Sequence, residues 1–144
     1  MKKALFVLLA LVAVVGFGVK DSMAGQLCWQ TEDNTVFKLV TGTPDPAHPW
    51  AKSLNGVWIF GGFAVPVTGS MVKSPYGTEL LINLDGTLPD MSTHYGMRGH
   101  VGPVSKNGTI TIYHSNTGGF DTEGLTKVSC KSIEAVIADL WSEH

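Results

Sequence analysis

The sequence has few charged residues, no basic run and only two cysteines. Charged residues make up 15% of its 144 residues, and the absence of a lysine or arginine stripe argues against a nucleic-acid partner. No long helical segment could connect parallel strands, which excludes parallel βαβ folds. No serine stands in the G-x-S-x-G context of many hydrolases. The sequence therefore predicts a protein that is not an enzyme and needs no cofactor.

One long apolar run does occur, at the N-terminus. Two lysines precede the apolar stretch 4–19, and Ser22 and Ala24 supply small side chains at positions −3 and −1 of a cleavage site. This layout is typical of a secretory signal peptide covering residues 1–24. A membrane anchor is the alternative, but the run is shorter than the roughly 20 residues that a spanning helix needs. The predicted mature chain, residues 25–144, is periplasmic or extracellular in a bacterium, with no membrane contact after cleavage.

The predicted mature chain is slightly acidic and forms a single domain. It has seven Lys and Arg against eleven Asp and Glu, a net charge of −4. Its two cysteines, Cys28 and Cys130, lie near its ends, and an oxidising compartment makes one disulfide between them the expectation. A lipid anchor on Cys28 would require small residues just before it, which Gln26 and Leu27 are not.

Alternating apolar and polar residues predict about eight short strands separated by turn-forming sequences. Gly61-Gly62 and Asn107-Gly108 are two-residue hairpin signals, and Asp85-Gly86 is expected to end a strand. Pro66 predicts an edge, a bulge or a bend, and the glycine-rich segment 116–124 predicts a loop. The predicted strands are residues 26–32, 35–42, 54–60, 63–71, 78–84, 91–100, 109–115 and 125–131.

The last dozen residues predict a helix over about 132–142. Ser132 is its expected N-cap, and Glu134 would lie at the positive end of the helix dipole. The apolar residues repeat at helical spacing and form one stripe that is expected to pack on the outside of the sheet. The stripe consists of Ile133, Val136, Ile137 and Leu140.

The predicted fold class is all-β: an antiparallel up-and-down β-barrel of about eight strands with a short C-terminal α-helix. A β-sandwich is the alternative. The two cysteines favour the barrel, because the first and last strands of such a barrel are neighbours and Cys28 would meet Cys130 at the closing seam.

The stretch Gly56-Val57-Trp58 resembles the G-x-W strand of lipocalins and of the wider calycin group, which includes avidin-like barrels. The strand count and the terminal helix agree with this resemblance. It implies an eight-stranded barrel whose interior binds a small, mostly apolar ligand, with Trp58 closing one end. In lipocalins the motif opens the first strand, whereas here two predicted strands precede it.

The first functional hypothesis is an exported, non-enzymatic binding protein that holds a small apolar or amphipathic ligand in or at the mouth of the barrel. Aromatic and apolar residues on one face of the central strands are the candidate lining, although they could equally fill a core. The candidate ligand-binding residues are Trp58, Phe60, Phe63, Val65, Val67, Met71, Tyr95 and Met97.

The alternative hypothesis is an interaction or inhibitor module that binds a partner protein through the proline-rich loop 43–50 and the glycine-rich segment 116–124. A metal site is not expected. His94, His100 and His114 lie in adjacent predicted strands, but no close histidine pair occurs, and His48 and His144 stand apart. Asp121 and Glu123 could bind calcium, although turn chemistry explains acidic residues there equally well.

Overall fold

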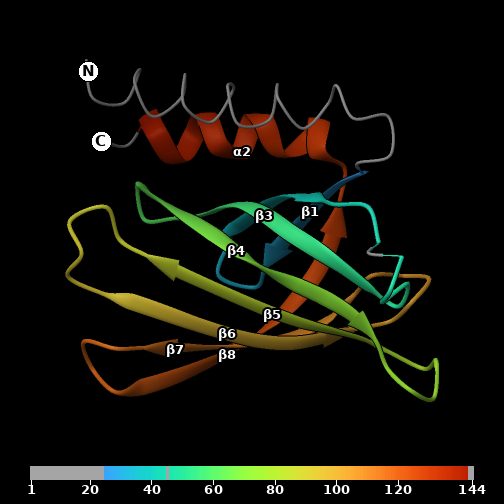
Figure 1. Cartoon of the computed structure of the whole chain (residues 1–144). Coiled ribbons are helices and arrows are strands. Elements are labelled where there is room, and N and C mark those ends of the chain that lie inside the picture. Colours follow the sequence, from blue (N-terminus) through green and yellow to red (C-terminus); the bar gives the residue numbers. More distant parts are fainter. Residues whose placement is uncertain (1–24, 45, 143–144) are drawn as a thin grey trace.

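The computed structural model describes residues 25–44 and 46–142. Its strands follow one another around a closed antiparallel barrel (Figure 1), each pairing with the next and β8 pairing back onto β1. The predicted up-and-down barrel is confirmed, and its closure rules out the sandwich. The strands are β1 (Gly25–Thr31), β2 (Val36–Thr41), β3 (Ala51–Phe60), β4 (Phe63–Lys73), β5 (Leu80–Thr87), β6 (His94–Val101), β7 (Gly108–His114) and β8 (Gly119–Val128).

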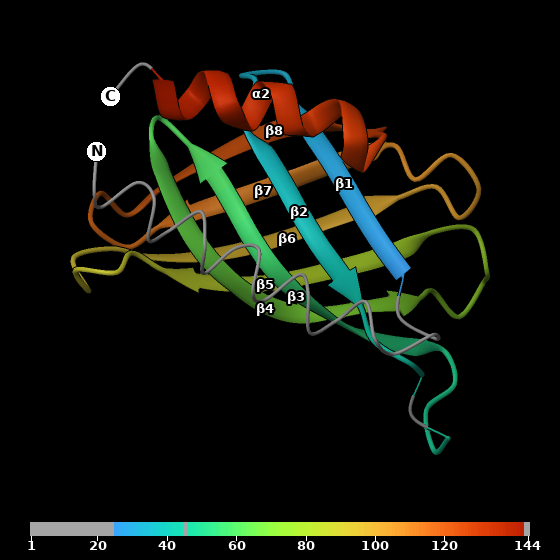
Figure 2. The same ribbon diagram turned by 90° about the horizontal axis from the view of Figure 1, so that it is seen from above.

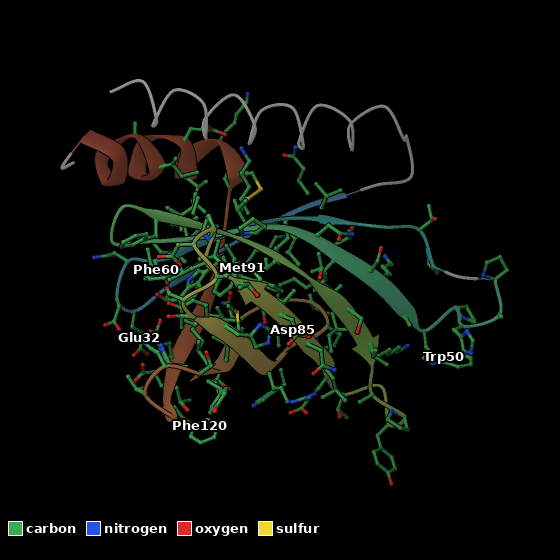
Figure 3. The ribbon with its side chains drawn as sticks, turned by 60° about the vertical axis from the view of Figure 1, so that its left-hand side comes forward. Glu32, Trp50, Phe60, Asp85, Met91 and Phe120 are labelled. Carbon is green, nitrogen blue, oxygen red and sulfur yellow. A yellow bond between two sulfur atoms is a disulfide. The ribbon has the colours of Figure 1, made fainter. Side chains whose placement is uncertain are left out.

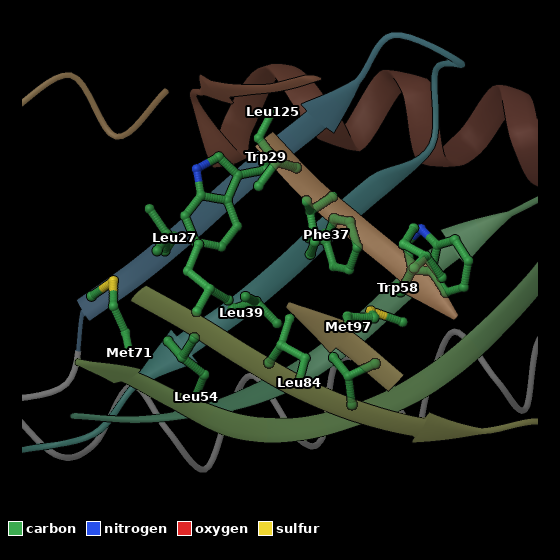
Figure 4. Packing of buried hydrophobic residues seen from close by; sticks show 14 of the residues in the cluster. Leu27, Trp29, Phe37, Leu39, Leu54, Trp58, Met71, Leu84, Met97 and Leu125 are labelled. Carbon is green, nitrogen blue, oxygen red and sulfur yellow. The ribbon is translucent and has the colours of Figure 1, made fainter. Parts of the chain in front are cut away.

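Side chains alternate between the barrel interior and the outer face along each strand, as the sequence pattern predicts. In β3, Leu54 and Trp58 are buried in the interior, whereas Ile59 is buried on the outer face. The interior is filled by one apolar cluster (Figure 4) to which every strand contributes. Its larger side chains include Leu27, Trp29, Phe37, Leu39, Leu54, Trp58, Met71, Ile82, Leu84, Met97, Ile110, Ile112 and Leu125.

Glycine lets neighbouring strands approach closely at the G-x-W sequence. A Cβ atom on Gly56 would lie 2.0 Å from the backbone oxygen of Lys38 in β2. Gly69 in β4 is in the same position against β5, where a Cβ atom would lie 1.8 Å from the backbone oxygen of Asn83. No larger residue fits at either position without moving a strand, so the glycine of the motif has a packing role in this fold.

Helix α2 (Cys130–Ser142) covers the outer face of β1 and β2 (Figures 1 and 2). Ile133 and Ile137 are buried there against Cys28, Val36 and Ile59, which confirms that the stripe packs outside the sheet. The side chains of the other two stripe residues lie outside the described part. Within the residues that the structure describes, no helix is long and apolar enough to cross a membrane.

The helix begins earlier than the sequence suggests. Ser129 is its N-cap, with its Oγ accepting a hydrogen bond from the backbone N–H of Lys131 at 3.3 Å. The prediction of Ser132 as N-cap is wrong, because its hydroxyl donates to the backbone oxygen of Ser129 from within the first turn. Glu134 lies beyond that turn, and its carboxylate pairs with the ammonium of Lys38 at 2.6 Å.

A disulfide joins Cys28 to Cys130, with 5.3 Å between the two Cα atoms. Cys28 is fully buried on the outer face of β1, and its partner in the β1–β8 ladder is Val128. The predicted bridge at the closing seam is therefore confirmed. Cys130 is the first residue of α2 rather than part of the last strand, because β8 ends at Val128.

Several predicted strand ends are wrong: β3 begins at Ala51 rather than at residue 54, and β6 begins at His94 rather than at residue 91. Two further ends differ because neighbouring strands pair with residues that were expected to turn. β5 does not stop at Asp85 and Gly86, because both residues continue the ladder with β6. Gly86 does not form a turn. It leaves room for its neighbours instead, since a Cβ atom there would lie 2.8 Å from the side chain of Val65. β8 begins at Gly119, so most of the predicted glycine-rich loop is paired with β7. Cross-strand pairing outweighs the local turn preference at both places.

Of the two predicted two-residue hairpin turns, one is correct and one is wrong. Gly61 and Gly62 have φ angles of 51° and 81° and form the two-residue connection between β3 and β4, as predicted. Asn107-Gly108 is not a two-residue turn, because the connection spans 102–107 and Gly108 belongs to β7. Pro66 pairs with β3, but the ladder to β5 starts only at the next residue, so Pro66 occupies the expected local edge.

The barrel has two ends, because the strands alternate in direction. We call end A the end formed by the connections 32–35, 61–62, 88–93 and 115–118, and end B the end formed by 42–50, 74–79 and 102–107. Figure 3 shows Glu32, Phe60 and Met91 near end A and Trp50 at the opposite end.

Candidate functional site at end A

Four aromatic side chains from β3, β4 and β6 gather at end A. The ring of Trp58 lies 4.1 Å from that of Phe60 and 5.1 Å from that of Tyr95, measured between ring centroids. Phe60 in turn lies 5.9 Å from Phe63. Trp58 and Tyr95 are buried, whereas Phe63 is 55% exposed. The aromatic surface therefore runs from the core out to the rim of the barrel.

A chain of hydroxyl groups connects this aromatic surface to β8. The indole N–H of Trp58 donates to Oγ1 of Thr35 at 3.1 Å, and that hydroxyl lies 2.8 Å from the hydroxyl of Thr31. The hydroxyl of Thr31 also faces the carboxyl group of Glu123, whose pKa it lowers. The register of β1 against β8 brings Thr31 close to Glu123, because Thr31 pairs with Leu125, two residues beyond Glu123.

The opposite side of the mouth is formed by an imidazole and a second carboxylate. The ring of His114 lies 5.4 Å from that of Tyr95, and its Nε2 atom lies 2.7 Å from Oδ2 of Asp121. Asp121 and Glu123 are two residues apart in β8 and share the inner face. We call this group of side chains at end A the mouth ring; it consists of Thr31, Thr35, Trp58, Tyr95, His114, Asp121 and Glu123.

The polar groups of the mouth ring are not fully satisfied. Oε2 of Glu123 and Nε2 of His114 are buried atoms without an aligned hydrogen-bond partner. Burial raises the pKa of the Glu123 carboxyl above its ordinary value, the neighbouring Asp33 and Asp121 raise it further, and the hydrogen bond with Thr31 opposes the shift. Burial likewise raises the pKa of the Tyr95 phenol, with a smaller effect from Asp90.

The structure divides the eight residues predicted to bind a ligand into two groups. Trp58, Phe60, Phe63 and Tyr95 lie at end A, where they meet one another. Val65 pairs with Trp58 across the β3–β4 ladder and is buried beside it, whereas Val67 and Met97 lie two residues further along their strands, deeper in the core. Met71 is buried toward end B (Figure 4).

Sequence reasoning missed the threonines of the mouth ring, and it assigned Asp121 and Glu123 to a loop. Alternation continued from Leu125 back to Gly119 would have placed both acidic residues on the inner face.

The histidines weighed as metal ligands do not come together. His94 and His100 lie on the outer face, where their rings approach Asp85 and Glu79, each at 3.5 Å. His114 lies on the inner face. In the part of the chain that the structure describes, no group of three or more His, Cys, Asp or Glu residues is placed to hold a metal ion.

The described clefts lie on the outside of the barrel rather than along its axis. A cleft of about 660 Å³ lies at end B between Trp50, Tyr76 and Leu81, on the outer surface of β4 and β5. A second, of about 350 Å³, lies over β6 to β8 beside Phe120. Because apolar side chains fill the interior, a ligand of this barrel would contact the mouth rather than a preformed central cavity.

No protein-family model and no curated protein matches the sequence. Among solved structures, the chain is similar to core-bradavidin, with a TM-score of 0.52 and 12% identity, over 72% of this chain and 100% of that chain. The fold is a small closed antiparallel β-barrel similar to that of core-bradavidin. At this identity the likeness shows the fold alone, and it does not point to lipocalins in particular, since the G-x-W sequence lies in the third strand.

Proposed function

We propose that this protein is an exported, non-enzymatic binding protein that holds a small apolar or amphipathic ligand at end A of its barrel. The observation that carries the proposal is the mouth ring, in which an aromatic surface lies beside the unsatisfied Oε2 atom of Glu123. Ligand sites in proteins combine these elements, an apolar wall and a few convergent polar groups. The proposed contacts are the aromatic residues at end A, with Val65, Val67 and Met97 supporting them from the core; Met71, toward end B, is not among them.

One unsatisfied atom argues for a ligand rather than for a purely structural role. A buried acceptor without a partner costs about 1–3 kcal/mol. Oε2 of Glu123 carries this cost at end A, whereas Nε2 of His114 lies 2.7 Å from Oδ2 of Asp121. A ligand that donates a hydrogen bond to Oε2 would offset the cost, while its apolar part contacts Phe60 and Phe63.

Export is part of the proposal. The buried disulfide is of a kind that persists in oxidising compartments, and it supports secretion into the periplasm or the medium. The predicted signal peptide itself lies outside the described residues.

The alternative, a module that binds a partner protein through two loops, loses its main argument. The proline-rich connection between β2 and β3 lies at end B, whereas the connection between β7 and β8 lies at end A. The two segments therefore cannot form one contact surface, and most of the glycine-rich segment is strand β8.

Native mass spectrometry of the protein purified from its own host tests the proposal. We expect a population heavier than the polypeptide, with the excess mass lost on denaturation. Phe60→Ala should reduce that population, because it removes a half-buried ring at the mouth. Phe120→Ala is the matched control, since that ring is 69% exposed on the outer face near the same end. An absence of bound mass in wild-type protein, or equal loss in both variants, would contradict the proposal.

A further inference from the structure

We infer that the outer cleft at end B is a second binding site, and that it takes a small aromatic anion, a flat ring that carries a carboxylate or a similar acidic group. The inference goes beyond the proposed function, because this cleft lies outside the barrel wall and at the opposite end from the mouth ring. It rests on the construction of the cleft, on its volume and on the charge at this end.

The floor of the cleft is an exposed apolar pair on the outside of the barrel. Val72 of β4 pairs with Leu81 of β5, and both residues line the cleft. Leu81 is 40% exposed. The volume of the cleft is about 660 Å³, which lies within the range of roughly 300–1,000 Å³ typical of small-molecule sites. The hollow therefore has the size for a ligand of one or two rings.

Two connections supply aromatic walls to the cleft. Trp50 comes from the connection between β2 and β3, and Tyr76 comes from the connection between β4 and β5. Their side chains are 53% and 89% exposed, and Figure 3 shows Trp50 at this end of the molecule. Aromatic side chains favour stacked or edge-to-face contacts with other rings. A flat aromatic ligand would cover more of this exposed surface than an aliphatic one of the same size.

Backbone hydrogen bonds hold both walls in place. The backbone N–H of Lys73 donates to the backbone oxygen of Trp50 at 2.9 Å, which joins the two connections. Within the second connection, the N–H of Gly77 donates to the oxygen of Ser74, also at 2.9 Å. The imidazole of His48 packs edge-on against the Trp50 ring, with 5.4 Å between the centroids. A cleft that is ordered before binding loses less conformational entropy when a ligand enters.

The charged side chain that lines the cleft is a cation. Lys73 extends over the connection 74–79, where a Cβ atom on Gly77 would lie 3.6 Å from its Cε. Among the described residues, no carboxylate forms an ion pair with its ammonium group. Glu79, the carboxylate of the same connection, lies 3.5 Å from Nδ1 of His100 instead. A ligand carboxylate would supply the missing partner, because hydrogen bonds between charged groups are stronger than neutral ones.

The wider charge of end B also favours an anion. Lys52, Lys106 and Lys127 lie at this end together with Lys73. Burial lowers the pKa of the Lys106 ammonium, the charges of Lys127 and Lys52 lower it further, and no carboxylate opposes them. A field of one sign raises the local concentration of ligands of the opposite sign. The same field repels a cationic ring, and a neutral ring gains only the contact with the aromatic walls.

Three probes that share an indole ring test the inference: indole-3-acetate is anionic, tryptophol is neutral and tryptamine is cationic. Titration followed by amide NMR shifts measures the affinity and locates the bound probe. We expect indole-3-acetate to bind about fivefold more tightly than tryptophol, as one exposed ion pair allows, and tryptamine to bind most weakly. The shifts should centre on Val72 and Leu81. Added salt should weaken the binding of indole-3-acetate and not that of tryptophol.

Two variants separate the roles of charge and ring. Lys73→Gln should remove the preference for indole-3-acetate, and Lys131→Gln is its matched control in α2, which covers β1 and β2. Trp50→Ala should weaken the binding of indole-3-acetate and of tryptophol, and Phe120→Ala is its control, because that exposed ring lies on the outer face near end A. Both controls should bind as wild type does. Circular dichroism checks that each variant keeps its secondary structure.

Equal affinity for the three indoles, shifts centred on end A, or no binding of indole-3-acetate at millimolar concentration would overturn the inference. The proposed function has a separate readout. Bound mass in native mass spectrometry that is lost in Phe60→Ala and kept in Trp50→Ala would support the site at end A, whatever the outcome with the indoles.

Discussion

The indole N–H of Trp29 donates a hydrogen bond to the backbone oxygen of Lys106 at 2.7 Å, which joins β1 to the connection between β6 and β7. Trp29 is fully buried, so its ring closes end B from inside while the Lys106 segment lies over it. Trp58 has the corresponding position near end A, where its N–H donates to Thr35. The two ends are therefore built differently, one closed by a connection and the other bordered by the mouth ring.

Trp29→Phe tests this closure. The variant keeps an aromatic ring but leaves the oxygen of Lys106 without its donor, so we expect a loss of about 1–3 kcal/mol in the free energy of unfolding. Urea titration followed by circular dichroism measures the loss. Ligand binding at end A should be unaffected, and a loss of binding with unchanged stability would show that end B, not end A, holds the ligand.

Gly56→Ala should destabilise the barrel, because the new Cβ atom would lie 2.0 Å from the backbone oxygen of Lys38. Overpacking of this kind costs about 1–3 kcal/mol, and more where backbone must move. Gly96→Ala is the control, since the nearest atom to its Cβ is the Asp85 carboxylate at 4.0 Å. Thermal unfolding of both variants decides the matter, and equal melting temperatures would refute the packing role of Gly56.

Replacing both cysteines by alanine should cost about 2–5 kcal/mol of stability. Alanine is preferable to serine, because Cys28 is fully buried beneath α2 and a hydroxyl there would lack a partner. We expect the barrel to persist while amide exchange increases first in β1 and α2. Non-reducing peptide mapping of exported wild-type protein should recover the linked peptides, and two free thiols would contradict the bridge.

The raised pKa of Glu123 predicts a dependence of stability on pH. The folded state holds the proton more tightly than the unfolded chain does, so this group stabilises the fold below its ordinary pKa of 4.5. That stability is lost as the pH rises through the higher folded value. Glu123→Gln should remove this loss and raise the free energy of unfolding at pH 7 modestly, since the side chain is partly exposed and solvent screens its interactions. Unfolding of wild type and variant at pH 4 and pH 7 measures the difference, which should vanish at the lower pH.

Cleavage of the signal peptide is tested by sequencing the N-terminus of protein recovered from the periplasm or medium. We expect the chain to begin at Gly25, the first residue of β1. Ala24→Leu should block processing, because signal peptidases require a small residue there. An intact N-terminus on wild-type protein in the membrane fraction would favour the anchor instead.

Local sequence pattern by itself determined most of the barrel. Alternation of apolar residues along 54–60 and 63–71 placed Trp58, Val65 and Val67 on the inner face, and Gly61-Gly62 marked the hairpin between them. These features depend on contacts between residues close in sequence. The disulfide was also predictable, because only two cysteines are present and each lies near one end of the mature chain.

Only the tertiary structure decided where β5 and β8 extend and which polar groups meet at end A. Asp85-Gly86 and the segment after Gly119 have strong local turn preferences, and they become strand because neighbouring strands pair with them. The mouth ring joins Thr31 to Glu123 and Tyr95 to His114 through register around the closed barrel. Register across a closing seam depends on every intervening strand, so no local pattern could specify it.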